Sequence, residues 1–281
     1  MSVIETNNPA LIDAALLRAR YGDHAVPATG EFNDVLRGLL GHCSVRAYWR
    51  EPLPSGTLET LVAAAQSAAT SSNMQFWSVI AVEDSGRKAR LAEIANKQAQ
   101  IEQAPLFLVW LADLSRLDRV AATLGHTLEA RDYLESFMVA AIDAGLAAQN
   151  AVVAAESMGL GTVYIGALRN DPVRVAAELG LPQHVMPVFG LCVGYADPAH
   201  PTAVKPRLPQ PIVLFRERYS PHQEMEQVAA YDKTLSAYSR AHGMGNVNWT
   251  DRVLARMASL KGMSGRDRMR AMMKALGFEL R

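Results

Sequence analysis

Two segments carry cations at spacings that suit an anion. In the run GHCSVR, residues 41–46, the side chains of His42, Ser44 and Arg46 follow one another at every second position. On an extended segment they point the same way and form one donor-rich face, which suits a phosphate. In KPRLP, residues 205–209, two cations flank a proline in a stiff loop that could clamp a phosphate. The alternatives are a helix C-terminus, which favours His and Arg, and a solvated surface linker.

Two further segments offer polar groups or close backbone approach. The run TSSNMQ, residues 70–75, precedes an expected strand, and its Asn and Gln amides both donate and accept, which suits the edge of a heteroaromatic ring. A capping loop favours the same composition. In GLGTVYIGALRN, residues 159–170, Gly166 can let the backbone approach a flat ligand. A helix stop and a strand-end turn explain the same glycines more simply. Gln98, near a helix end, has no distinctive signal of its own.

Composition excludes several classes of protein. Lys and Arg total 28, as do Asp and Glu, so the net charge is zero and gives no general attraction to nucleic acid. Cys43 and Cys192 are far apart and give neither a disulfide framework nor paired zinc ligands, so we expect a reduced, cytoplasmic protein without a metal site. The sequence has no P-loop, G-x-G-x-x-G, G-x-S-x-G or H-E-x-x-H motif, and the N-terminus does not resemble a secretory signal.

Few, short strands separated by helices are expected to position these segments, which indicates an α/β or α+β layer. We expect helices over about 8–22, 32–40, 55–68, 85–96, 134–158 and 171–180, and strands over about 76–83, 106–112, 162–165 and 185–194. Residues 113–131 form a polar stretch, and the chain from about Ser220 is mostly helical. The alanine-rich helix over 134–158 is about 38 Å long and should be buried at a domain centre or a subunit interface. Charges such as Asp143 within it argue against a membrane span.

Taken in order, these segments resemble the flavin-dependent nitroreductase superfamily. Within it they are similar to the oxygen-insensitive NADPH nitroreductase and NADPH–flavin oxidoreductase group. That group carries His-Arg-Ser-x-Arg, a Ser-rich loop, a lone Gln, Tyr-Ile-Gly-Gly-Leu-Arg-Asn and Lys-Pro-Arg-Leu-Pro. Here the corresponding segments are HCSVR, ATSSNMQ, Gln98, YIGALRN and KPRLP. The resemblance extends from about Asp34 to Tyr238 and fades beyond about Asn246.

The resemblance implies an α+β fold of the nitroreductase type, in which a small, mainly antiparallel sheet is wrapped by helices. It also implies an intertwined homodimer, with the long central helix in the interface and two FMN sites made by both subunits. We therefore divide the chain into an N-terminal extension (1–31), an FMN-binding core (32–219) and a helical C-terminal tail or lid (220–281).

The resemblance also assigns residues to the cofactor. His42, Ser44, Lys205 and Arg207 would hold the FMN phosphate, and Arg46 would stabilise negative charge on the ring as an electrostatic group. The remaining residues expected at the ribityl chain, the ring or a backbone wall near N5 are Cys43, Ser71, Ser72, Asn73, Gln75, Gln98, Tyr164, Ile165, Gly166, Ala167, Leu168 and Arg169. No side chain is expected to act as a nucleophile.

The implied activity is a ping-pong reduction of nitroaromatics or quinones, with hydride transfer from NAD(P)H through flavin N5. The alternatives are a flavin reductase, a specialised reductase such as a dehalogenase, and a non-catalytic flavin-binding protein. Three positions depart from the group: Cys43 replaces an arginine, Ala167 replaces a glycine, and His242 stands where an arginine binds the NADPH 2′-phosphate. Arg240 is the neighbouring candidate, and the choice between NADPH and NADH stays open. The expected partners are a second copy of the chain and a small aromatic acceptor, with no nucleic acid and no membrane.

Overall fold

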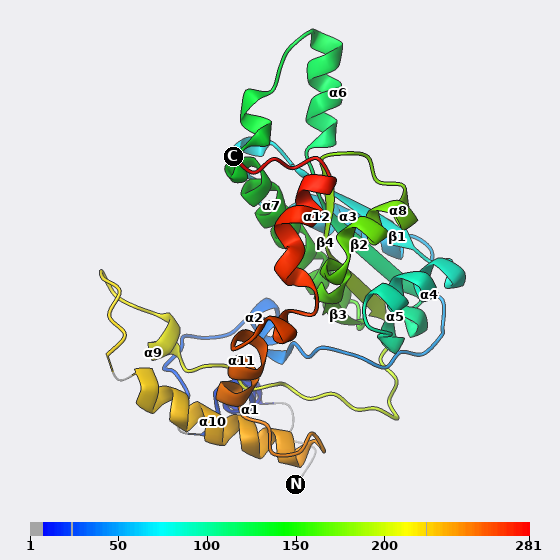
Figure 1. Ribbon diagram of the computed structural model, residues 1–281. Helices are drawn as coiled ribbons and strands as arrows, with labels where there is room; N and C mark the ends of the chain where they lie inside the picture. The colour runs from blue at the N-terminus through cyan, green and yellow to red at the C-terminus, as the bar shows by residue number, and fades with distance from the viewer. Residues whose placement is uncertain (1–7, 24, 223) are drawn as a thin grey trace. The chain divides into compact units, whose positions relative to one another are not determined.

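The computed structural model describes residues 8–23, 25–222 and 224–281 (Figure 1). The chain forms two compact units. We call Met1–Cys43 with Thr202–Met263 the helical unit, and Ser44–Pro201 with Ser264–Arg281 the sheet unit. Each unit draws on two separate stretches of the chain, so residues far apart in sequence are neighbours within it.

The sheet unit is built on four antiparallel strands in the order β1-β2-β4-β3. Their bounds are Trp77–Val82 (β1), Leu106–Asp113 (β2), Gly161–Ile165 (β3) and Val185–Gly194 (β4). Every residue of β2 is buried, as expected for a central strand that is apolar on both faces. The predicted small antiparallel sheet with helices around it is therefore confirmed.

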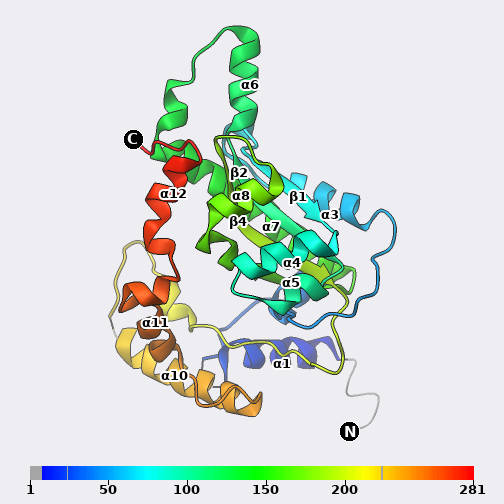
Figure 2. The ribbon, with the colours of Figure 1, turned by 45° about the vertical axis from the view of Figure 1, so that its right-hand side comes forward.

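Helices cover both faces of this sheet (Figures 1 and 2). On one face, α7 (Leu134–Ser157) and α3 (Thr57–Gln66) share a hydrophobic cluster with the sheet that includes Leu61, Trp110 and Leu191. On the other face, α4 (Ser85–Ile94), α5 (Ala99–Gln103) and α8 (Pro172–Leu179) contribute to a second cluster. The sheet is thus the middle layer of its unit.

The alanines of α7 allow it to lie close to the sheet. Ala140, Ala144, Ala147, Ala148, Ala151 and Ala155 are buried. The helix is long and apolar enough in composition to cross a membrane, but this alanine face belongs to the core of the sheet unit. Its apolar residues at every fourth position, Leu134, Met138, Ile142 and Leu146, are 44–57% exposed. The helix therefore has one face in the core and a second apolar face outside it.

The predicted polar stretch 113–131 contains a helix, α6 (Ser115–Leu124), and a 3-10 turn (Glu129–Asp132). The carboxylate of Asp113 accepts hydrogen bonds from the backbone N–H and the hydroxyl of Ser115 at 3.0 and 2.7 Å, which fixes the start of α6. Gly125, with φ +68°, ends it. In Figure 1, α6 extends beyond the end of the sheet.

The last part of the chain also belongs to the sheet unit. It contains a 3-10 turn (Arg266–Arg268) and α12 (Met269–Ala275), and Met273 and Phe278 join a third cluster beside Phe76. The backbone N–H of Arg281 donates to the carbonyl of Asp132 at 3.0 Å, so the C-terminus is tied to the segment before α7.

The helical unit contains α1 (Pro9–Tyr21), α2 (Asp34–Gly41), α9 (Gln210–Val213), α10 (Glu224–Ala241) and α11 (Trp249–Met257). Local signals bound α1: Asn8 accepts from the N–H of Ala10 at 3.1 Å, Pro9 is the first helical residue, and Gly22 (φ +76°) follows the last turn. Asn33 caps α2 in the same way by accepting from the N–H of Leu36 at 3.0 Å.

Candidate functional site

The predicted site residues are divided between the two units. The helical unit contains His42, Cys43, Lys205, Arg207, Arg240 and His242. The sheet unit contains Ser44, Arg46, Ser71, Ser72, Asn73, Gln75, Gln98 and the run from Tyr164 to Arg169. Each set is described within its own unit.

In the helical unit, one buried side chain joins the two predicted phosphate-binding segments. Arg20, at the end of α1, is 6% exposed. Its Nη2 donates to the carbonyls of His42 (2.9 Å) and Leu40 (2.6 Å), and its Nη1 donates to the carbonyl of Lys205 (2.9 Å). The structure therefore brings residue 42 and residue 205 to the same guanidinium. Sequence analysis missed Arg20, because neither its position nor its neighbours distinguish it from a surface arginine.

Two tyrosines of α10 hold the same loop from another side. The hydroxyl of Tyr238 donates to the carbonyl of Ala203 at 3.1 Å, and that of Tyr231 donates to the carbonyl of Pro206 at 2.9 Å. Burial raises the pKa of Tyr231, so its hydroxyl keeps its proton and remains a donor. The carbonyls of Ala203, Lys205 and Pro206 are thus bound by side chains of α1 and α10.

A cavity of about 490 Å³ opens beside this loop. The cations Lys205, Arg207 and Arg252 line it together with the aromatic rings of Tyr21, Tyr231 and Trp249. Guanidinium and ammonium groups are the donors that proteins use for phosphate, so these three cations fit a phosphate group. Of the residues predicted for the FMN phosphate, Lys205 and Arg207 line this cavity, whereas His42 and Ser44 do not.

The other predicted residues of the helical unit have local partners. The thiol of Cys43 lies 3.1 Å from the hydroxyl of Thr202. The ring of His242 stacks on Tyr238 at 4.1 Å between centroids, and its Nδ1 lies 2.8 Å from the carbonyl of Tyr238. Arg240 donates to the side-chain oxygen of Asn246 at 2.7 Å.

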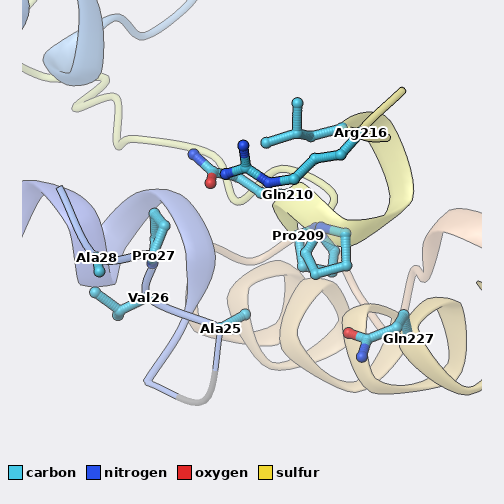
Figure 3. A pocket seen from close by; sticks show the side chains of 10 residues that line it. Ala25, Val26, Pro27, Ala28, Pro209, Gln210, Arg216 and Gln227 are labelled. Carbon is cyan, nitrogen blue, oxygen red and sulfur yellow. The ribbon is translucent and has the colours of Figure 1, made fainter. Parts of the chain in front are cut away.

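A second cavity in the helical unit, of about 540 Å³, contains none of the predicted site residues (Figure 3). Ala25, Val26, Pro27 and Ala28 line one side of it, and Pro209, Gln210 and Arg216 line another. The segment after α1 and the chain around Pro209–Arg216 therefore line the same cavity.

In the sheet unit, the start of the segment Ser44–Arg46 runs beside β3. The N–H of Val45 donates to the carbonyl of Thr162 at 2.9 Å, and Ser44 forms a parallel bridge with Thr162. A Cβ atom at Gly161 would lie 2.4 Å from Cγ2 of Val45, so this close approach requires the glycine. Val45 is buried and Arg46 is exposed, which is the alternation expected of an extended segment.

The predicted ring-binding loop is anchored to the interior of α7 by a buried carboxylate. Asp143 is 2% exposed. It accepts hydrogen bonds from the hydroxyl of Thr70 (2.5 Å), the N–H of Ser71 (3.3 Å) and the N–H of Phe76 (3.2 Å). The charge that interrupts the alanine-rich helix is thus satisfied by both ends of the loop, a role that sequence analysis did not assign to it.

This loop holds three non-glycine residues in the left-handed region. The φ angles of Ser72, Asn73 and Gln75 are +48°, +56° and +54°. Such angles are sparsely populated and persist where surrounding contacts impose them. The side chains of residues 71–75 are exposed, and Asp143 binds the backbone N–H groups at the two ends of the loop. The loop therefore presents polar groups in fixed positions to a ligand.

The end of β3 offers mainly backbone. The side chains of Ile165, Ala167 and Leu168 are buried, and Arg169 donates through Nη1 to the carbonyl of Val188. Gly166 does not have a positive φ. Instead, a Cβ atom there would lie 3.2 Å from Nη2 of Arg169, so the glycine leaves room for that guanidinium.

Tyr164 and Gln98 also have partners within the sheet unit. The ring of Tyr164 meets Phe189 edge-on at 5.2 Å, and burial raises the pKa of its hydroxyl. The amide of Gln98 donates to the carbonyl of Ala95 at 3.1 Å and accepts from Gln100 at 2.7 Å. In residues 8–23, 25–222 and 224–281, no group of three or more His, Cys, Asp or Glu residues could hold a metal ion.

Comparisons with known proteins match nearly the whole chain from residue 39 onward. A model described as the nitroreductase family matches residues 39–195, and one described as the C-terminal domain of that family matches residues 205–281. The match therefore continues beyond Asn246, where the sequence analysis expected it to fade.

Two curated relatives show the same similarity. The chain is 40% identical over 227 residues to an FMN reductase (NADPH) from Bacillus subtilis, which covers 79% of this chain and 90% of the relative. It is 36% identical over 219 residues to an oxygen-insensitive NADPH nitroreductase from Salmonella typhimurium, covering 76% and 87%.

Solved structures give similar values. Nitroreductase A from Vibrio parahaemolyticus superposes with a TM-score of 0.80 at 33% identity, covering 89% of this chain and 100% of that one. NADPH:FMN oxidoreductase from Vibrio harveyi, in complex with NAD⁺, superposes with a TM-score of 0.78 at 32% identity and the same coverage.

Proposed function

The chain belongs to the nitroreductase family, and on that basis we propose that it uses FMN to pass two electrons from NAD(P)H to a nitroaromatic or a quinone. Relatives named FMN reductase, NADPH–flavin oxidoreductase and nitroreductase confirm the predicted group, enzyme class and cofactor class. The structural observation that carries the proposal is the meeting of the segments at 42 and 205 on Arg20, beside a cation-lined cavity.

In this proposal, the residues predicted from the two cation-bearing segments bind the FMN phosphate. His42, Lys205 and Arg207 would donate to it, with Ser44 from the following segment. The loop that carries two of these cations has its carbonyls already bound by Arg20, Tyr231 and Tyr238. Because the backbone is fixed beforehand, little conformational entropy would be lost on binding.

Other predicted residues would contact the ring and the ribityl chain. Ser71, Ser72, Asn73 and Gln75 would donate and accept from the loop that Asp143 fixes, Gln98 would contact the ring, and the backbone of 164–167 would form a wall. Arg46, which is exposed, would place a fixed cation beside the ring and stabilise negative charge that develops there.

The chemistry itself comes from the cofactor: FMN, when bound, accepts a hydride and returns two electrons to a second substrate at the same face. The chain's own residues bind and orient. Fixed donors of the 71–75 loop would keep the ring in one position, and the partly exposed Tyr164 would bound the space for an acceptor.

The apolar stripe of α7 supports a homodimer as the working form. Leu134, Met138, Ile142 and Leu146 lie on one face of the helix and are 44–57% exposed. Such a contiguous apolar stripe is typical of an interface. A second copy of this chain is its proposed partner, and the cytoplasm, where NAD(P)H is available, is the proposed location.

Steady-state rates test the proposed activity and separate it from its rivals. Nitroarenes, quinones and free FMN would each be supplied as acceptor, with NADPH or NADH as donor. We expect turnover of a nitroarene or a quinone with parallel double-reciprocal lines, the pattern of a ping-pong reaction. Turnover of free FMN alone would indicate a flavin reductase. Bound flavin that responds to neither nicotinamide would indicate a carrier, and a protein without affinity for FMN would contradict the proposal.

A further inference from the structure

We propose that Arg20 is a positioning residue for the FMN phosphate, so that helix α1 is part of the cofactor site. This inference rests on the proposed function, because it concerns the same cofactor. It adds a residue and a whole helix that lie before the family match, which begins at residue 39. Arg20 contacts the phosphate-binding segments through their backbone and acts through them.

The guanidinium of Arg20 is buried and donates to backbone carbonyls. Arg20 is 6% exposed, although it lies at the end of a short helix near the N-terminus. A buried cation is costly unless its donors are satisfied. Here they are satisfied by the carbonyls of Leu40, His42 and Lys205 at 2.6–2.9 Å. The side chain of Arg20 therefore joins the two segments in the interior of the helical unit.

The two terminal nitrogens of the Arg20 guanidinium bond different segments. The guanidinium is planar and rigid, so its two terminal nitrogens have a fixed separation. One of them bonds the carbonyl of His42 and the other bonds that of Lys205. The guanidinium therefore holds these two carbonyls at a fixed separation, which suits a site that binds one phosphate from two segments.

The KPRLP loop also donates a hydrogen bond back to Arg20. The N–H of Arg207 donates to the carbonyl of Arg20 at 2.8 Å. Arg20 thus binds the loop through its side chain at Lys205 and through its backbone at Arg207. The hydroxyls of Tyr231 and Tyr238 donate to carbonyls of the loop. The side chain of Arg20 also donates to the segment at His42.

A positioning role differs from general stabilisation in which ligand it affects. Riboflavin has the same ring and ribityl chain as FMN but no phosphate. If Arg20 sets the phosphate-binding segments, its loss weakens FMN binding and leaves riboflavin binding unchanged. If it only stabilises the fold, both affinities fall together.

The experiment measures the dissociation constants of FMN and riboflavin for the full-length apoprotein. The variants are Arg20→Met and Arg20→Lys, with Arg18→Met as the matched control, since Arg18 is exposed on the same helix. We expect Arg20→Met to reduce the preference for FMN over riboflavin about tenfold, because the phosphate donors that Arg20 positions would together lose about the free energy of one charge-assisted hydrogen bond. We expect Arg20→Lys to lose part of it and Arg18→Met to lose none.

The outcomes separate this inference from the proposed function. An unchanged preference in Arg20→Met, or an equal loss of both affinities, would overturn the role of Arg20 and leave the proposed function intact. A wild-type protein that binds riboflavin as tightly as FMN would overturn the phosphate site itself.

A second measurement does not depend on the variants. In the wild-type protein, hydrogen exchange at the Arg207 amide should slow on adding FMN more than on adding riboflavin. Equal slowing by the two ligands would contradict the inference.

Discussion

Asp143 illustrates at the residue scale how one buried carboxylate fixes a loop. It accepts from the hydroxyl of Thr70 and from the N–H groups of Ser71 and Phe76, and it is 2% exposed. A carboxylate in this place accepts from all three donors, whereas an amide would turn one donor of its own towards them. The left-handed residues of the loop depend on this anchor.

Asp143→Asn should therefore lower the free energy of unfolding by about 1.5–3 kcal/mol, the range for hydrogen bonds to charged groups. Chemical denaturation measures the change. Glu135→Gln, an exposed carboxylate on the same helix, is the control and should change it by less than about 0.5 kcal/mol. Equal effects of the two substitutions would show that Asp143 does not anchor the loop.

His242 is the residue at which coenzyme choice can be tested. It stacks on Tyr238 and occupies the position where the resemblance places an arginine for the NADPH 2′-phosphate. His242→Arg should raise the ratio of kcat/KM for NADPH over NADH about tenfold through one charge-assisted contact. Steady-state kinetics with both coenzymes measure the ratio. His222→Arg adds the same charge at another exposed site and should leave it unchanged. If both substitutions act alike, position 242 is not a coenzyme contact.

At the element scale, the junction of β2 and α6 supports the ring-binding loop. Burial alone would raise the pKa of Asp113, but hydrogen bonds from Ser78 and Ser115 and the charge of Arg116 outweigh it and hold the pKa below its ordinary 3.8. Arg116 in turn donates to the carbonyl of Gln75 at 2.9 Å. The carboxylate of Asp113 at the end of β2 thus helps to position Arg116, which donates to the ring-binding loop.

A depressed carboxyl pKa gives stability that is present above the unfolded value and lost as the pH falls through the folded value. Wild type should therefore be more stable than Asp113→Asn above pH 3.8, and the difference should shrink as the pH falls below 3.8. Unfolding by denaturant at a series of pH values on both sides of 3.8 measures it. A difference that stays constant across that range would contradict the assigned hydrogen bonds.

Elements with local signals could be predicted from the sequence. Asn8, Pro9 and Gly22 bound α1, and the continuous apolar run 106–112 indicates the central strand, because helix caps and apolar runs consist of neighbouring residues. Helix α6 was not predicted, because its residues lie within the polar stretch expected over 113–131. The hydrogen bonds of Arg20 join residues up to 185 positions apart in the sequence, and no local sequence pattern predicts them.

At the scale of the whole molecule, the exposed face of α7 makes a prediction about assembly. Ile142, 57% exposed, lies near the middle of the apolar stripe. Ile142→Glu would place a charge in the proposed interface and should convert the dimer to a monomer in sedimentation or light scattering. Val173→Glu, on α8, is the control and should leave the dimer intact. A dimer that survives Ile142→Glu would place the interface elsewhere.

The candidate site was predicted residue by residue only through resemblance, because each motif alone has a simpler explanation. The structure adds the groups beneath the motifs: Arg20, Asp143 and the tyrosines of α10. The role of these residues depends on tertiary contacts between distant segments, so their spacing along the sequence does not indicate it.

Anaerobic absorbance of the purified protein tests the central claim most directly. One equivalent of NADPH or NADH should bleach the bound FMN, and a nitroarene or quinone added afterwards should restore the colour without further nicotinamide. Flavin that keeps its absorbance with both nicotinamides, or that is bleached but not restored by any acceptor of these classes, would contradict the account.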